Sequence, residues 1–284
     1  MQKILVPTDF SANAFKAIAY AAEIAKVSGA QLHLLHVIEP SVNMVTMQTD
    51  SLNKEVIKNR TTQLSNTLKS ASSVYPEIKI TPSLIGGKVA DSIINYSQKN
   101  GITLIVMGTK GAGGMKKFLI GTVASETVSK SRVPVLTIPV SYQVAKPENI
   151  VFATNQFEKN NNILENIMHI PALFSSVIHV AVVRESGANE DAELIYNEEQ
   201  LNDYVKFLEE NYSEIKFKAA FIEGEDFETS IESYCDKNGV DMVTMVTYPK
   251  TFFERIFQRS ETKRMVFHST IPTLAIPAIP LMTN

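Results

Sequence analysis

The stretch GGKVADSIINYSQKNGITLIVMG, residues 86–108, occurs a second time in the chain in related form. Residues 224–246 read GEDFETSIESYCDKNGVDMVTMV and align with it at a constant offset of 138. Both stretches place apolar side chains at helical spacing and then end in a short apolar run, which is typical of a helix followed by a buried strand. A repeat of this length indicates two copies of one structural design.

The repeat extends in both directions from this stretch. VPVLTIP (133–139) aligns with IPTLAIP (271–277) at the same offset, and KILVPTDF (3–10) resembles NIVFATNQ (149–156) at an offset of 146. The second copy is therefore shorter in its middle. A polar linker with a proline, residues 141–149, lies between the copies. We predict two domains of one fold, residues 1–143 and residues 144–284.

Each copy alternates between apolar runs and helical patterns, which predicts an α/β fold. In each domain we expect a five-stranded parallel sheet with helices on both faces, a Rossmann-like arrangement in which ligands bind beyond the carboxyl ends of the strands. The elements expected in the first copy are strands at 3–8, 32–37, 79–85, 102–107 and 133–139, and helices at 11–28, 51–74, 89–99 and 122–130.

The charge of the chain is divided unevenly between the copies. Residues 1–145 hold 15 Lys and Arg against 8 Asp and Glu, a balance of +7. This leaves 12 of the 27 basic residues and 22 of the 30 acidic residues for the remainder, a balance of −10. The first copy is therefore better suited to an anionic ligand. The chain has no basic run with interleaved aromatic residues, so we do not expect nucleic acid as a partner.

The composition also predicts where the protein acts. The chain has 284 residues, of which 44% are hydrophobic, so it has enough apolar side chains for a sizeable core. The apolar runs are too short for a membrane-spanning helix, and the first residues do not resemble a secretory signal. Cys235 is the single cysteine, which excludes an internal disulfide and a cysteine-based zinc site. We expect a cytoplasmic protein without a membrane partner.

A glycine-rich segment, GTKGAGGMKKFLIGT (108–122), follows the fourth expected strand of the first copy. It does not match the P-loop pattern, because no Gly-Lys-Ser or Gly-Lys-Thr occurs in the chain. The dinucleotide fingerprint is also excluded, because it requires glycines directly after the first strand, and PTDFSANA (7–14) contains none. The glycines of the segment allow a tight turn, and a helix that begins after Gly121 would offer free N–H groups and a positive dipole to phosphate. Glycines also serve ordinary turns, so the residues alone leave open whether anything binds.

The spacing Gly108-x2-Gly111-x9-Gly121-Thr122 resembles the nucleotide motif of the universal stress protein family. ILVPTDFS and VPVLTIP also resemble the first and last strands of that family. The resemblance covers all of the first copy and, more weakly, the second, so the chain is similar to a tandem member. The resemblance implies ATP as ligand and leaves open whether Mg²⁺ accompanies it. The residues that it implicates are Pro7, Thr8, Asp9 and Val37 for adenosine, and Met107, Gly108, Gly111, Gly121, Thr122 and Val123 for ribose and phosphates.

The second copy departs from this motif. Its residues at the three glycine positions are Val246, Pro249 and Arg259, and Asn155 aligns with Asp9. Side chains then occupy the space that a close backbone approach needs, and proline removes an N–H group. We therefore predict that only the first domain holds a nucleotide. Arg259 has three readings: it binds another anion, fills the pocket from within, or pairs with surface acids.

The sequence offers little for catalysis, and we assign no catalytic or metal-ligating residue. We expect His36 and His179 to occupy equivalent strand positions and to have structural roles. Asp9 either bonds a ribose hydroxyl and helps to place a divalent ion, or caps the first helix. Slow hydrolysis of ATP is the most that we expect. The alternatives to an ATP-binding signalling protein are a ligand-free interaction scaffold and a weak Mg²⁺-dependent ATPase.

The apolar final strands, 133–139 and 271–277, predict contacts at sheet edges. The resemblance implies that the two copies meet through these strands as an internal pseudo-dimer. It also implies a role in stress response, and it leaves open a homodimer of chains and an unknown client protein as partners.

Overall fold

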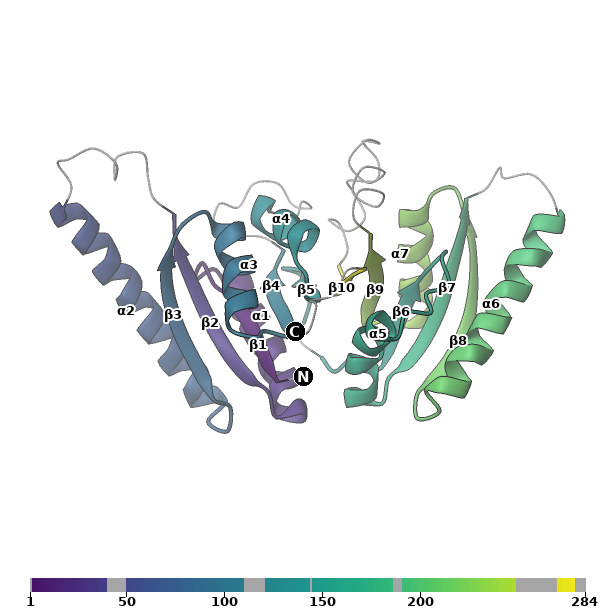
Figure 1. Cartoon of the computed structure of the whole chain (residues 1–284), viewed down its shortest axis with the longest axis horizontal. Helices are drawn as coiled ribbons and strands as arrows, with labels where there is room; N and C mark the ends of the chain where they lie inside the picture. The colour runs from purple at the N-terminus through teal and green to yellow at the C-terminus, as the bar shows by residue number, and fades with distance from the viewer. Residues whose placement is uncertain are drawn as a thin grey trace. The chain divides into compact units, whose positions relative to one another are not determined.

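Strands and helices alternate along the first unit of the chain, from β1 to β5, in the computed structural model (Figure 1). The structure describes residues 2–39, 50–109, 121–143, 145–185, 191–248 and 270–278. The chain divides into two compact units, Met1–Val144 and Ala145–Asn284.

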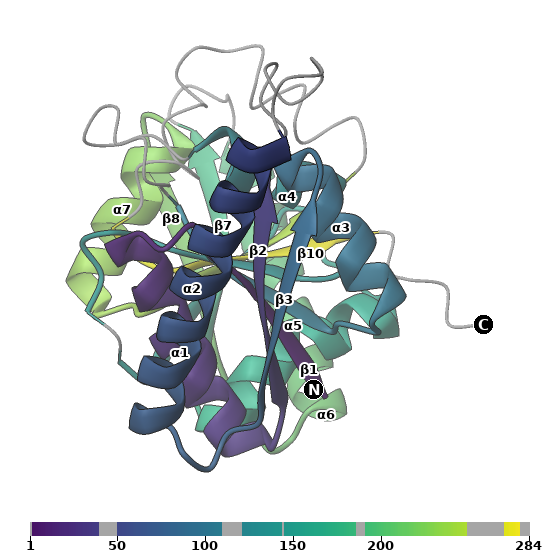
Figure 2. The ribbon, with the colours of Figure 1, turned by 90° about the vertical axis from the view of Figure 1, so that its left-hand side faces the viewer.

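The first unit contains one parallel sheet whose strand order is β3-β2-β1-β4-β5. Its strands are β1 (Lys3–Pro7), β2 (Gln31–Ile38), β3 (Ile80–Gly86), β4 (Leu104–Gly108) and β5 (Val135–Ile138), and its helices are α1 (Ala12–Ser28), α2 (Asp50–Val74), α3 (Val89–Lys99) and α4 (Thr122–Lys130). Figure 2 shows α1 and α2 on one side of the β2 and β3 ribbons, and α3 and α4 on the other side. The predicted α/β fold with helices on both faces is confirmed.

Local sequence signals explain the ends of α1. The Ser11 side chain accepts a hydrogen bond from the backbone N–H of Ala14 at 3.2 Å, which caps the first turn. Gly29 ends the helix with a left-handed φ of 70°, and its N–H donates to the Ala25 carbonyl. Between these caps, buried alanines and Tyr20 form the helix face that packs on the central strands β1 and β4. The core of the unit lies here.

The second unit repeats the sheet with the order β8-β7-β6-β9-β10, again all parallel within the unit. Its strands are β6 (Asn149–Ala153), β7 (Val177–Glu185), β8 (Lys216–Gly224), β9 (Met242–Thr247) and β10 (Thr273–Pro277), and its helices are α5 (Asn161–Phe174), α6 (Asp191–Asn211) and α7 (Phe227–Asn238). Among its described residues, a cluster of apolar side chains from β6, β7, β8, α7 and β9 forms part of the core.

The strand registers fix which residues of the two units correspond. Lys3 pairs with Gln31 in the first unit, and Asn149 pairs with Val177 in the second, so the offset of 146 holds for both strands. His179 therefore corresponds to His33, and the residue that corresponds to His36 is Val182. The prediction that His36 and His179 are equivalent was wrong. The offset of 146, which relates β1 to β6, also relates β2 to β7, and the prediction did not apply it to these second strands.

Candidate functional site

Three neighbouring strands of the first unit, β2, β1 and β4, end at the same edge of the sheet. Pro7 is the last residue of β1 and pairs with Leu35 of β2, two positions before Val37. On its other side β1 pairs with β4, in which Met107 is buried and Gly108 is the last residue. The structure thus brings the strand-end residues that the sequence singled out to one carboxyl edge, where ligands of parallel α/β sheets bind.

Hydrogen bonds hold the turn from β1 to α1 in one conformation. The Thr8 N–H donates to the Leu35 carbonyl at 2.8 Å, and the Thr8 hydroxyl accepts from the Phe10 N–H at 3.0 Å. The Asp9 carboxylate accepts from the Ser11 N–H at 3.0 Å. Asp9 therefore supports the turn that leads into α1, while Ser11 is the N-cap itself. Phe10 adopts a left-handed φ of 66°, which a non-glycine residue keeps only when its surroundings hold it.

The start of α4 lies next to the end of β4. The Gly121 N–H donates to the Thr109 carbonyl at 2.6 Å, which joins the N-cap of α4 to the residue after β4. Gly121 is the N-cap residue and has no side chain with which to cap the helix, and Thr122 is exposed in the first turn. A helix N-terminus in this position offers N–H donors, a hydroxyl and the positive dipole end, which suit phosphate oxygens.

Gly108 has a packing reason to be glycine. A Cβ on Gly108 would lie 2.5 Å from Nδ2 and 2.8 Å from Cγ of Asn13, whose side chain is buried at the start of α1. The missing Cβ thus makes room for a side chain of the protein at this point. A ligand role for the Gly108 backbone stays a prediction.

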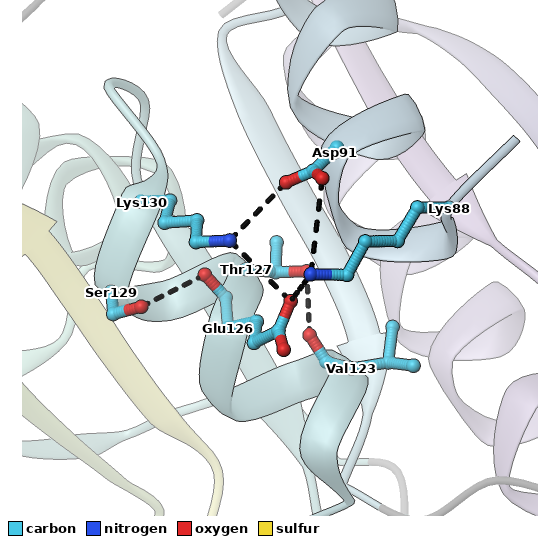
Figure 3. A network of polar contacts seen from close by, with 7 residues as sticks. All are labelled: Lys88, Asp91, Val123, Glu126, Thr127, Ser129 and Lys130. Atoms are coloured by element: carbon cyan, nitrogen blue, oxygen red, sulfur yellow. Dashed lines mark hydrogen bonds and ion pairs between the residues drawn. The ribbon is translucent and has the colours of Figure 1, made fainter.

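Four charged side chains join α3 to α4 and form a closed ring, the charge quartet (Figure 3). Lys88 Nζ lies 3.2 Å from a Glu126 carboxylate oxygen, and Lys130 Nζ lies 3.2 Å from a carboxylate oxygen of Asp91. The ring closes through Lys130–Glu126 at 3.5 Å and Lys88–Asp91 at 3.9 Å. Hydrogen bonding from Lys88 lowers the pKa of Glu126, and hydrogen bonding to Asp91 raises the pKa of Lys130. The quartet links the start of α3 to the middle and the last turn of α4.

His36 is a residue at this edge to which the sequence analysis gave only a structural role. Its Nδ1 lies 2.7 Å from the Thr8 carbonyl oxygen, and its ring centroid lies 4.4 Å from that of Phe10. Burial lowers the pKa of His36, Arg60 lowers it further, and the bond to Thr8 and the charge of Asp9 act in the opposite direction. Its position directly before Val37 in β2 was the available signal, and the mistaken pairing with His179 concealed it.

Some predicted site residues lie outside the described residues. They are Gly111 of the first unit and, at the compared positions of the second unit, Pro249 and Arg259. Within the part of the chain that the structure describes, no group of three His, Cys, Asp or Glu side chains could hold a metal ion. None of the described helices combines the length and the apolar character that crossing a membrane requires.

The corresponding edge of the second unit is built differently. Tyr248, directly after β9, donates from its hydroxyl to the Glu158 carboxylate at 2.9 Å, and the Tyr204 hydroxyl donates to the Glu158 backbone carbonyl at 2.5 Å. Phe157 packs edge-on against Tyr204 with ring centroids 5.4 Å apart. Burial raises the pKa of both tyrosines, and both stay protonated donors. These four residues, the Tyr248 cluster, connect the turn after β6 to the end of β9.

Comparisons with known proteins bear on the family and the fold of the chain. The sequence profile of the universal stress protein family matches residues 1–139. Universal stress protein MJ0531 of Methanocaldococcus jannaschii is 29% identical over 139 residues, which cover 48% of this chain and 81% of that protein. Universal stress protein YxiE of Bacillus subtilis is 29% identical over 146 residues, which cover 48% of this chain and 97% of that protein.

A solved structure shows the same fold over nearly the whole chain. The universal stress protein from Archaeoglobus fulgidus aligns with a TM-score of 0.68 at 18% identity and covers 97% of this chain and 96% of its own. At this identity the likeness concerns the fold alone, whereas the family profile rests on sequence. Residues 1–139 of this chain therefore form a domain of the universal stress protein family.

Proposed function

We propose that the first unit binds ATP at the carboxyl edge of β2, β1 and β4, and that the protein acts in stress response as a nucleotide-dependent signal. The observation that carries the proposal is the hydrogen bond from the Gly121 N–H to the Thr109 carbonyl. This bond joins the N-terminus of α4 to the residue after β4, which supports a phosphate position there, because helix N-termini suit phosphate and ligands of parallel sheets bind at this edge.

The residues divide between the two ends of the nucleotide. The turn after β1 and the end of β2 would hold adenosine, and the end of β4 with the first turn of α4 would hold ribose and phosphates. The proposed adenosine residues are Pro7, Thr8, Asp9 and Val37, and the proposed ribose and phosphate residues are Met107, Gly108, Gly111, Gly121, Thr122 and Val123. When Mg²⁺ accompanies ATP, it neutralises charge on the phosphates. Asp9, in the turn between β1 and α1, has a carboxylate that could help to hold this ion.

The second unit holds no nucleotide in this proposal. Ala153 stands where the first unit has Pro7, and Val246 brings a side chain to the position of Gly108. The Tyr248 cluster supports the proposal, because it joins the turn after β6 to the end of β9 with side chains of the unit itself.

The biological part of the proposal follows from the family. We infer a cytoplasmic protein in which bound ATP changes the surface that a client protein or a second copy of the chain would meet. The contact between the two units as an internal pseudo-dimer also remains a prediction. An empty scaffold and a weak Mg²⁺-dependent ATPase are the competing functions, and nucleotide extraction and phosphate release distinguish them.

The substitution Gly121→Val tests the proposed site. Gly121 has φ −62° and ψ 151°, which any residue adopts, so valine adds bulk at the phosphate end without straining the backbone. We expect calorimetry to show ATP affinity reduced by more than about tenfold, because the close approach to the helix N-terminus is lost. Nucleotide released from the purified wild-type chain by acid should be absent from the variant.

Ser129→Val is the matched control, since it adds valine at the other end of α4 and should leave ATP affinity unchanged. Unchanged ATP binding by Gly121→Val would show that the phosphate end is assigned wrongly. A wild-type chain that neither releases nor binds nucleotide would favour the scaffold, and Mg²⁺-dependent phosphate release would favour the ATPase.

A further inference from the structure

Two buried histidines lie three positions apart in β2 and contact different elements. His33 Nδ1 lies 3.0 Å from the Tyr96 hydroxyl of α3, whereas His36 Nδ1 lies 2.7 Å from the Thr8 carbonyl oxygen of the β1–α1 turn. Both residues are 7% exposed, so the exposed fraction does not distinguish them. Residues three apart in a strand point to opposite faces of the sheet.

The second unit retains one of these histidines and lacks the other. His179 corresponds to His33, and its Nδ1 lies 2.8 Å from the Tyr234 hydroxyl, which repeats the pair of the first unit. The position of His36 is taken by Val182. The His33–Tyr96 pair therefore belongs to the shared architecture. His36 occurs only in the unit that carries the glycine motif.

The geometry identifies the tautomer of His36 and its structural effect. A backbone carbonyl only accepts hydrogen bonds, so the short contact to Thr8 requires a proton on Nδ1 of the imidazole. The same ring lies against Phe10, with centroids 4.4 Å apart and an interplanar angle of 34°. His36 thus contacts the turn at two points: the carbonyl of Thr8 and the ring of the left-handed residue Phe10.

We infer that His36 is a positioning residue for the nucleotide edge, because its Nδ1–H and its ring hold the turn that presents Thr8 and Asp9. The inference rests on the proposed function for its ligand, but its structural half does not depend on any ligand. In the second unit the left-handed residue Phe157 packs on Tyr204 instead, so that unit stabilises its turn without a histidine.

The structural half is tested on the full chain without nucleotide. Long-range ¹H–¹⁵N NMR spectra should show the His36 proton on Nδ1 at neutral pH, which is the less common tautomer of free imidazole. In His36→Leu, the amide protons of Phe10 and Ser11 should exchange about tenfold faster than in the wild type, because the turn loses its support. His36→Asn should restore slow exchange, since its Nδ2 can replace Nδ1 as donor.

The nucleotide half is tested by titrating the same variants with ATP. We expect His36→Leu to weaken ATP binding about tenfold, because leucine cannot donate the buried hydrogen bond to the turn. His36→Asn keeps a donor for this bond, so its ATP affinity should stay within about threefold of the wild type. His33→Leu is the matched control: it removes a buried histidine from the same strand, and it should lower the unfolding midpoint without changing ATP affinity.

The outcomes separate this inference from the proposed function. A proton on Nε2, or unchanged amide exchange in His36→Leu, overturns the positioning role of His36 whether or not ATP binds. Equal ATP affinity of His36→Leu and the wild type overturns the nucleotide half. A wild-type chain that takes up no ATP overturns the proposed function and this nucleotide half together, while the NMR measurements still decide the role of His36 in the turn.

Discussion

Gly108 and Asn13 share one small space between the end of β4 and the start of α1. A Cβ atom at position 108 would collide with the side chain of Asn13, so only glycine fits there while Asn13 keeps its position. In the second unit α5 begins only at Asn161, so Lys159, which corresponds to Asn13, lies before the helix. This later start explains how Val246 can replace Gly108 without a collision of the same kind.

The substitution Gly108→Ala should therefore destabilise the first unit. The added methyl group forces Asn13 to move, and overpacking of this kind costs about 1–3 kcal/mol in the free energy of unfolding. Urea unfolding of the single variants and of Gly108→Ala with Asn13→Ala measures the effect. The double variant should be more stable than the sum of the two single changes predicts, because alanine at position 13 removes the collision. Strict additivity would show that the two residues do not compete for space.

Individual residues mark the limit of what the sequence could predict. The cap at Ser11 and the end of α1 at Gly29 were predictable, because both depend on a few neighbouring residues. The contact between Gly108 and Asn13 was not, because it joins residues almost a hundred positions apart through the packing of a helix on a strand. The contact between His36 and Thr8 was missed for a similar reason, since Thr8 lies in the turn after β1 and His36 lies in β2.

At the level of elements, α4 carries the phosphate end of the proposed site. Its N-terminus is fixed to β4 by the Gly121–Thr109 bond, and its body is fixed to α3 by the charge quartet. The quartet side chains are 39–57% exposed, so solvent and salt weaken each ion pair. A closed ring of alternating charges still favours one orientation of α4 over others, because each charge meets two partners of opposite sign.

Glu126→Gln should lower the thermal unfolding midpoint of the chain at low ionic strength. The change opens the ring and leaves Lys88 and Lys130 joined only through Asp91. Hydrogen bonding from Lys88, which lowers the pKa of Glu126, stabilises the charged ring and is lost with the carboxylate charge. The deficit should shrink between about 0.05 M and about 1 M NaCl, because the screening length falls to about 3 Å.

Glu77→Gln serves as the control, since Glu77 is exposed in the same unit and forms no ion pair with the residues that the structure describes. A Glu126→Gln deficit that is equal at both salt concentrations would argue that the quartet does not act through charge.

Most element boundaries followed from local patterns. The predicted helices 89–99 and 122–130 agree with α3 and α4 at both ends, and the predicted strands differ from β1 to β5 by at most two residues at either end. Helical spacing and turn residues act within a few positions, so a sequence can reveal them. The late start of α5 was not predicted, because the turn before it is shaped by Glu158 through its bonds to Tyr204 and Tyr248.

On the scale of the whole molecule, the two units share a strand order but differ at the edge where a ligand would bind. Among the described residues of the first unit, this edge carries Gly108, His36 and the N-terminus of α4. The second unit joins the same strand ends through the Tyr248 cluster. The repeat in the sequence was sufficient to predict the common fold, because the offsets of 138 and 146 preserve the order of the elements. The Tyr248 cluster was beyond prediction, since its residues come from three separate elements.

The difference between the units leads to the central claim, which is one ATP site in a chain with two similar sheets. Isothermal titration of the nucleotide-free full chain with ATP and Mg²⁺ tests it most directly. The account predicts a stoichiometry of one ATP per chain for the wild type and loss of that site in Gly121→Val. Two equivalents of ATP per chain, or one equivalent that survives Gly121→Val, would contradict it.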